Sequence, residues 1–183
     1  MMLNKLKKYA NRRNILIGFG LIILFNAVLF PMGLKKMQAI APQAAGPFDL
    51  EFSYTPDQAV KMLESYTSEG RSIYTKSTLF VDGLYPITYG VTFTLLLLLL
   101  LPWAFPKNTK IEALTALPFV IVIADFIENT GIILMLQTYP DEIRAYATFS
   151  STFSSIKWSL VGVLMLIIVV SFIKILISKT NEK

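Results

Sequence analysis

Residues 79–103 read LFVDGLYPITYGVTFTLLLLLLLPW, and this stretch decides the class of fold. Seven consecutive leucines at 95–101 do not match a soluble helix, whose apolar side chains recur on one face only. A helix crosses the hydrocarbon layer of a membrane with about 20 predominantly apolar residues. The stretch exceeds that length, which predicts a span that is tilted or begins above the membrane.

Three further stretches have the same character, and the composition of the chain agrees with them. Of the 183 residues, 54% are hydrophobic and 16% are charged, against roughly 45–50% and about 25% in soluble domains. The sequence predicts an all-α fold, a bundle of four transmembrane helices in one integral membrane domain over residues 1–183. The spans are expected at about 14–32, 79–103, 111–136 and 153–177.

The chain contains no histidine and no cysteine. Zinc, haem, copper and iron–sulfur sites of the usual ligand types are therefore excluded, as are thiol chemistry and Ser-His catalysis. We expect no metal ion and no cofactor, and the sequence leaves open whether the chain is an enzyme. The net charge of +5 does not indicate nucleic acid as a partner, because the positive charges lie mainly at membrane edges.

The distribution of lysine and arginine predicts the orientation, since cytoplasmic loops carry the excess of these residues. The two termini and the loop between spans two and three together hold ten, and the opposite side holds six. We therefore expect a multi-pass protein of the cell membrane, a bacterial inner membrane, with both termini in the cytoplasm. The ten are Lys5, Lys7, Lys8, Arg12, Arg13, Lys107, Lys110, Lys174, Lys179 and Lys183; the six are Lys35, Lys36, Lys61, Arg71, Lys76 and Arg144.

Residues 34–78 are expected to form an extracytoplasmic segment between spans one and two. Its first part, 41–54, is rich in proline and glycine and is predicted to be irregular. Thr55 followed by Pro56 and Gln58 then predicts the start of a short amphipathic helix with a capping box, and Gly70 is expected at a helix C-terminus. This helix would lie on the outer membrane surface, cap the bundle, or act as a lid over a cavity.

Four charged residues are expected at bilayer depth. They are Asp82, Asp125, Glu128 and Lys157. Each costs about 2.5–3.5 kcal/mol at bilayer depth, and such residues are functional candidates by default. Asp125, Glu128 and Asn129 have helical spacing, so we expect them on one face of span three.

Spans two and four add further polar and aromatic groups. If span two is one continuous helix, a stripe reaches from Arg71 through Asp82 and Tyr85 to Tyr89, and Pro86 would kink it. Trp158 accompanies Lys157 on span four. Such a cluster forms either a functional polar pocket or an ion-pair network that fixes helix packing. The leucines at 95–101 are expected to face lipid, and three glycines are expected at packing contacts: Gly18, Gly20 and Gly162.

The order of these residues resembles that of small four-span bacterial membrane proteins with no assigned activity, over about residues 55–165. The pattern comprises Tyr66, Gly70-Arg71, Tyr74, Asp82, Tyr85-Pro86, Tyr89, Asp125-Phe126-Ile127-Glu128-Asn129 and Lys157-Trp158. The lipoprotein signal peptidases are similar in size, span number and orientation and use two membrane aspartates, but here span four carries Lys157 where an aspartate would be needed. The EXPERA-type sterol-binding and sterol-isomerase proteins are similar in layout only.

We therefore expect a lipid-like or amphipathic small molecule to bind in an outward-facing polar pocket, with membrane lipid as the natural partner. The alternatives are a proton- or ion-coupled transport component and an accessory subunit, acting as a homo-oligomer or with a partner membrane protein. The candidate ligand-binding residues are Arg71, Asp82, Tyr85, Tyr89, Asp125, Glu128, Asn129, Lys157 and Trp158.

Overall fold

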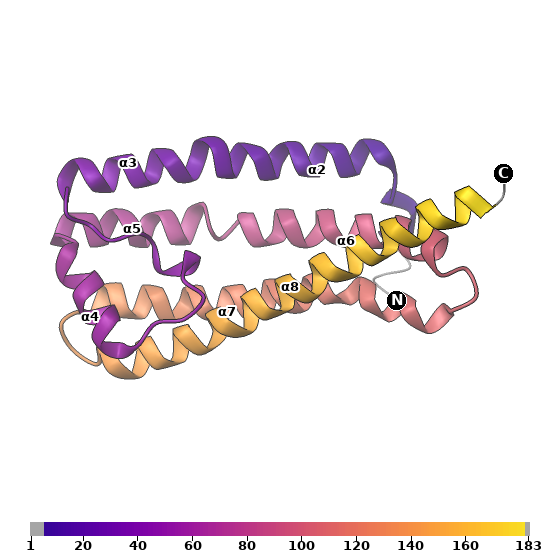
Figure 1. Cartoon of the computed structure of the whole chain (residues 1–183). Coiled ribbons are helices and arrows are strands. Elements are labelled where there is room, and N and C mark those ends of the chain that lie inside the picture. Colours follow the sequence, from indigo (N-terminus) through magenta and orange to yellow (C-terminus); the bar gives the residue numbers. More distant parts are fainter. Residues whose placement is uncertain (1–5, 182–183) are drawn as a thin grey trace.

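A computed structural model describes residues 6–181 of the chain, and Lys5 and Lys183 of the charge count lie outside them. These residues are almost entirely helical and include no strand. Four long helical segments run along one axis (Figure 1), which confirms the predicted all-α four-helix bundle. In chain order the elements are η1 Lys7–Tyr9, α2 Arg12–Leu24, the π-helix η2 Phe25–Leu29, α3 Phe30–Ile40, η3 Phe48–Leu50, α4 Pro56–Ser65, α5 Ser68–Phe80, α6 Tyr85–Ala104, η4 Thr109–Ala116, α7 Leu117–Thr138 and α8 Ile143–Asn181.

All four segments are long and apolar enough to cross a membrane, so the chain is a multi-pass membrane protein. The segments are Arg12–Ile40, Ser68–Ala104, Lys110–Thr138 and Ile143–Ser178, and each contains one predicted span. The fourth has 36 residues. At about 1.5 Å per residue it is much longer than the hydrocarbon layer, about 30 Å thick. The helices therefore extend outside the hydrocarbon layer.

The two ends of the bundle differ in content. One end holds the start of α2, the connection between α6 and α7 and the end of α8, while α4 and η3 lie toward the other end (Figure 1). An ion pair between Lys7 and Glu112, 2.9 Å long, joins the N-terminal region to the α6–α7 connection. Both ends of the described chain thus lie at the same end of the bundle.

Span two is broken rather than kinked. Helix α5 ends at Phe80, residues 81–84 form a turn, and α6 begins at Tyr85 with Pro86 in its first turn. Proline is favoured there because the first-turn N–H groups need no intrahelical acceptor. The condition for a continuous stripe is therefore not met, the expected kink inside a helix at Pro86 is wrong, and Asp82 lies in the break.

Helix α4 begins as the sequence predicts. The Thr55 hydroxyl accepts a hydrogen bond from the Gln58 N–H at 3.2 Å, and the Gln58 side chain accepts one from the Thr55 N–H at 2.7 Å. Ala59 and Leu63 are fully buried, and α4 packs on α8. The expected C-terminal role of Gly70 is wrong, because Gly70 lies in the first turn of α5, whose N-cap is Thr67.

Helix α6 lies at the centre of the bundle, in contact with α2, α7 and α8. Leu97 and Leu101 are fully buried, and most of the other leucines at 95–101 are buried too. The expectation that this run faces lipid is therefore wrong. A helix that is apolar on every side can face either lipid or other helices, since lipid tails are as apolar as leucine.

The glycines divide into two groups. A Cβ atom on Gly18 would collide with Thr92 of α6, so Gly18 lets α2 approach that helix closely. Gly131 has the same role between α7 and α8, where an added Cβ would lie 2.8 Å from the Ser150 Cβ atom. Gly20 and Gly162 face open space, so the predicted packing role is wrong for both.

Candidate ligand-binding site

A buried ion cluster joins α7 to α8. The Lys157 Nζ atom lies 2.6 Å from Glu128 Oε2 and 3.7 Å from Asp125 Oδ1. Asp125 and Glu128 lie one helical turn apart on α7, so one lysine side chain reaches both. The Glu128 carbonyl accepts a hydrogen bond from the Ser150 hydroxyl at 2.9 Å, which fixes the register of the two helices.

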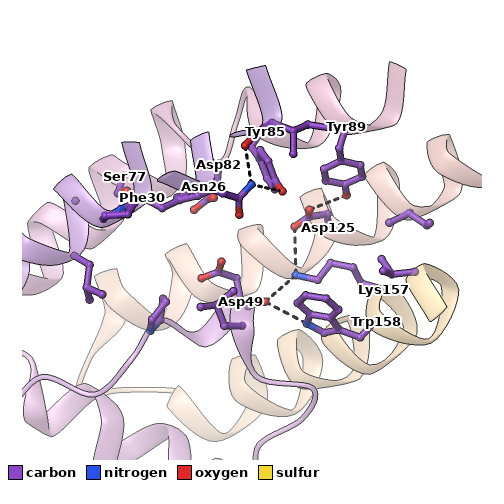
Figure 2. A pocket seen from close by; sticks show the side chains of 18 of the residues that line it. Asn26, Phe30, Asp49, Ser77, Asp82, Tyr85, Tyr89, Asp125, Lys157 and Trp158 are labelled. Carbon is purple, nitrogen blue, oxygen red and sulfur yellow. Dashed lines mark hydrogen bonds and ion pairs between the residues drawn. The ribbon is translucent and has the colours of Figure 1, made fainter. Parts of the chain in front are cut away.

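Two neutral side chains extend the cluster. The Tyr89 hydroxyl of α6 donates to Asp125 Oδ2 at 2.8 Å, and the Asn129 amide donates to Asp125 Oδ1 at 3.4 Å. Asp125 therefore receives hydrogen bonds from two sides in addition to the charge of Lys157. Figure 2 shows its contacts with Tyr89 and Lys157. Three helices, α6, α7 and α8, meet at this one carboxylate.

Residues 47–54, which we call the inserted segment, run alongside α8 and reach Lys157. The backbone carbonyl of Asp49 accepts from Lys157 Nζ at 3.1 Å and from the Trp158 indole N–H at 3.3 Å. Closer to the N-terminus of α8, the Phe52 carbonyl accepts a hydrogen bond from the Ser155 hydroxyl at 3.0 Å. Irregular backbone at membrane depth is tolerated where protein covers it or where it lines a cavity. Helix α8 covers the inserted segment in this way, and its polar side chains donate hydrogen bonds to the carbonyl groups of the segment.

Phe48 anchors the inserted segment. Its side chain is fully buried among three tyrosines, with ring centroids 5.0 Å from Tyr54, 6.1 Å from Tyr66 and 6.4 Å from Tyr74. The Phe48 N–H donates to the Tyr74 hydroxyl at 2.7 Å, which in turn donates to an Asp49 carboxylate oxygen at 3.0 Å. Burial raises the pKa of Tyr54 and of Tyr66 well above the usual value, so both phenols stay neutral.

A cavity of about 540 Å³ lies beside the cluster. Span one forms one wall, α8 and the inserted segment form the opposite wall, and α5, α6 and α7 complete it. Figure 2 shows carboxylates, tyrosines and Trp158 gathered around this space. Away from them the lining is apolar and includes Ile22, Phe93, Val161, Leu164 and Met165.

Six of the nine predicted site residues line the cavity, and three do not. The six are Asp82, Tyr85, Tyr89, Asp125, Lys157 and Trp158. Glu128 is fully buried behind the wall, where it pairs with Lys157, and Asn129 lies beside it. Arg71 lies elsewhere, with its guanidinium donating to the Tyr66 carbonyl at 2.9 Å and stacking on the ring of Tyr139.

Sequence reasoning missed several lining residues. The sequence predicts that Asp49 lies in an irregular external stretch, and nothing in it indicates that Tyr74 and Ser77 line a pocket, yet all three line the cavity. Asn26 of span one donates to the Tyr85 hydroxyl at 2.9 Å and is exposed at the edge of the cavity. One feature of the sequence does indicate that this stretch packs against the protein. Residues 48–54 contain three aromatic side chains, which is unusual for a loop surrounded by water.

Comparisons of the chain with protein families, with curated proteins and with solved structures find no match. Support for a function therefore comes from the geometry of the cluster and the cavity.

Proposed function

We propose that the protein binds a lipid-like or amphipathic small molecule in this cavity. Asp125 and Asp82 contact the polar head of the ligand, and Lys157 balances the charge of Asp125. Tyr85, Tyr89 and Trp158 form the walls around the head. The tail lies along the apolar lining of span one and α8.

The observation that carries the proposal is the division of one cavity into two parts. Polar and ionisable groups gather near Asp82 and Asp125, and aliphatic and aromatic side chains line the rest. Ligand cavities in proteins have volumes of about 300–1,000 Å³ and combine mostly apolar walls with a few polar groups. A molecule with a small polar head and one apolar tail matches this division.

The proposal assigns different roles to members of the cluster. Glu128 is fully buried and does not line the cavity, and its pairing with Lys157 supports a packing role between α7 and α8. Asp125 and Asp82 line the cavity and are available to a ligand. The two interpretations of the cluster, packing and binding, thus apply to different residues.

We place the cavity in the outer half of a cell membrane with both termini in the cytoplasm. Support comes from the excess of lysine and arginine at the end of the bundle that holds the termini. The ion pair between Lys7 and Glu112 supports a common side for the N-terminal region and the α6–α7 connection.

A proton relay has one observation in its favour, the contacts that connect Tyr89, Asp125, Lys157 and Glu128. On the cytoplasmic side of Tyr89 the core consists mainly of leucine and isoleucine, which include Leu97, Leu101, Ile121, Leu164 and Ile168. A relay through the bundle needs ionisable groups along its whole length. Binding is therefore the better supported function, and partner proteins remain a prediction.

Native mass spectrometry of protein released from lipid nanodiscs tests the proposal. Leu34 and Met165 line the cavity from span one and from α8, and replacing both with tryptophan fills it. We expect wild type to retain one amphipathic molecule and the double variant to lose it by about tenfold or more, since overpacking costs about 1–3 kcal/mol.

The matched control carries tryptophan at Leu16 and Leu166, which lie on the same two segments but are 70% and 63% exposed and outside the cavity. It should retain the molecule as wild type does. Wild-type protein that carries no ligand, or retention that is equal in all three proteins, would contradict binding in the cavity.

A further inference from the structure

The carboxylates at the cavity outnumber the positive charges. Among the described residues that line it, Asp49, Asp82 and Asp125 are acidic, and Lys157 is the one basic residue. The Lys157 ammonium is already shared between Glu128 and Asp125 and also donates to the Asp49 carbonyl. Among the described residues that line the cavity, no positive charge is left for Asp82.

Asp82 is buried and has no partner within the described residues. The side chain is 7% exposed, lines the cavity, and makes no hydrogen bond or ion pair to residues 6–181. Its position follows from the break in span two, where the Asp82 N–H donates to the Ser77 carbonyl at 3.2 Å. The break thus holds a carboxylate at the cavity (Figure 2).

A buried anion without a partner is costly, and a ligand cation beside it offsets that cost. Aromatic rings also attract cations over their faces, and Tyr74, Tyr85 and Trp158 line the same cavity. An anionic head, such as a phosphate, would lie among Asp49, Asp82 and Asp125 and be repelled. We propose that the ligand is an amphiphile whose head is a protonated amine, and this rests on the proposed function above.

The tail of such an amphiphile has a place between span one and α8. Leu34 and Ile22 line one side of the cavity, and Val161 and Met165 line the other. Within the described residues, α8 packs on α4, α6 and α7 and has no comparable contact with α2 or α3. Met165 is 41% exposed and Asn26 is exposed as well. The amine therefore lies at Asp82, and the tail follows α8 toward the lipid.

The two tryptophans of the chain make this proposal measurable. Trp158 lines the cavity, whereas Trp103 is 70% exposed near the other end of α6. A Trp103→Phe protein in phosphatidylcholine vesicles reports on the cavity, and a Trp158→Phe protein reports on partition into the lipid. The probes are dodecylamine and dodecanol, each with bromine, a fluorescence quencher, in the middle of the chain, so that a head at Asp82 holds the bromine near Trp158.

We expect brominated dodecylamine to quench Trp158 at about tenfold lower membrane concentration than brominated dodecanol, because a hydrogen bond between two charged groups changes affinity by about that factor. Quenching of Trp103 in the Trp158→Phe protein should follow membrane concentration alone. Asp82→Asn should remove the preference for the amine at Trp158, and the exposed Asp141→Asn control should retain it.

Equal quenching of Trp158 by the amine and by the alcohol, both stronger than quenching of Trp103, would overturn the amine head and leave amphiphile binding intact. An amine preference that survives Asp82→Asn would overturn the assignment to Asp82. If neither probe quenches Trp158 more than Trp103, amphiphile binding in the cavity fails together with the amine proposal.

Discussion

Replacing Lys157 with methionine should lower the free energy of unfolding by about 3–5 kcal/mol, because it leaves buried carboxylates without their cation. Lys157 lies 2.6 Å from Glu128 and 3.7 Å from Asp125, and its side chain is almost completely buried. Methionine has a similar length and shape, so the lost charge dominates the effect. Reversible unfolding in mixed detergent micelles measures the change.

The double variant Lys157→Met with Glu128→Gln provides the control. Glu128 is fully buried and pairs with Lys157, so neutralising it should recover a large part of the lost stability. A single Lys157→Met variant as stable as wild type would show that the lysine and glutamate are not a charged pair.

Replacing Phe48 with alanine should cost about 3–5 kcal/mol, as is typical for a fully buried phenylalanine. The Phe48 ring packs against Tyr54, Tyr66 and Tyr74, and it holds the inserted segment against α8. We therefore expect a lower unfolding midpoint and faster proteolysis within residues 41–54, because the inserted segment separates from the bundle in more molecules.

Phe52 gives the matched control from the same segment. The side chain is 57% exposed, and only its backbone carbonyl bonds to Ser155. Phe52→Ala should therefore change stability by about 0.5 kcal/mol or less. If Phe48→Ala and Phe52→Ala had equal effects on stability and proteolysis, Phe48 would not anchor the segment.

Local signals in the sequence predicted the helices well. The threonine, proline and glutamine at 55–58 satisfy the N-terminus of α4 as expected, because a capping box depends only on residues within one turn. The four spans were also recognisable, since length and apolar composition suffice for that. The spacing of Asp125 and Glu128 predicted that both lie on one face of span three, and in the structure both lie within reach of Lys157.

Features that depend on contacts between distant segments were not predictable in the same way. The break at 81–84 shifts the phase between α5 and α6, so the expected stripe from Arg71 to Tyr89 does not exist as one face. Nothing local to Asp49 indicates that its carbonyl meets Lys157, more than 100 residues away. The burial of Leu97 and Leu101 likewise follows from the central position of α6.

Photocrosslinking tests binding in the cavity most directly. In phosphatidylcholine vesicles that hold the protein together with a single-chain alkylamine or alkyl alcohol carrying a diazirine, the crosslinked residues are mapped by peptide mass spectrometry. We predict crosslinks concentrated at Leu34, Val161 and Met165, which line the cavity, and their loss in the Leu34→Trp, Met165→Trp double variant. Crosslinks spread evenly over exposed positions such as Leu166 and Ile173, with none enriched at the cavity, would contradict it.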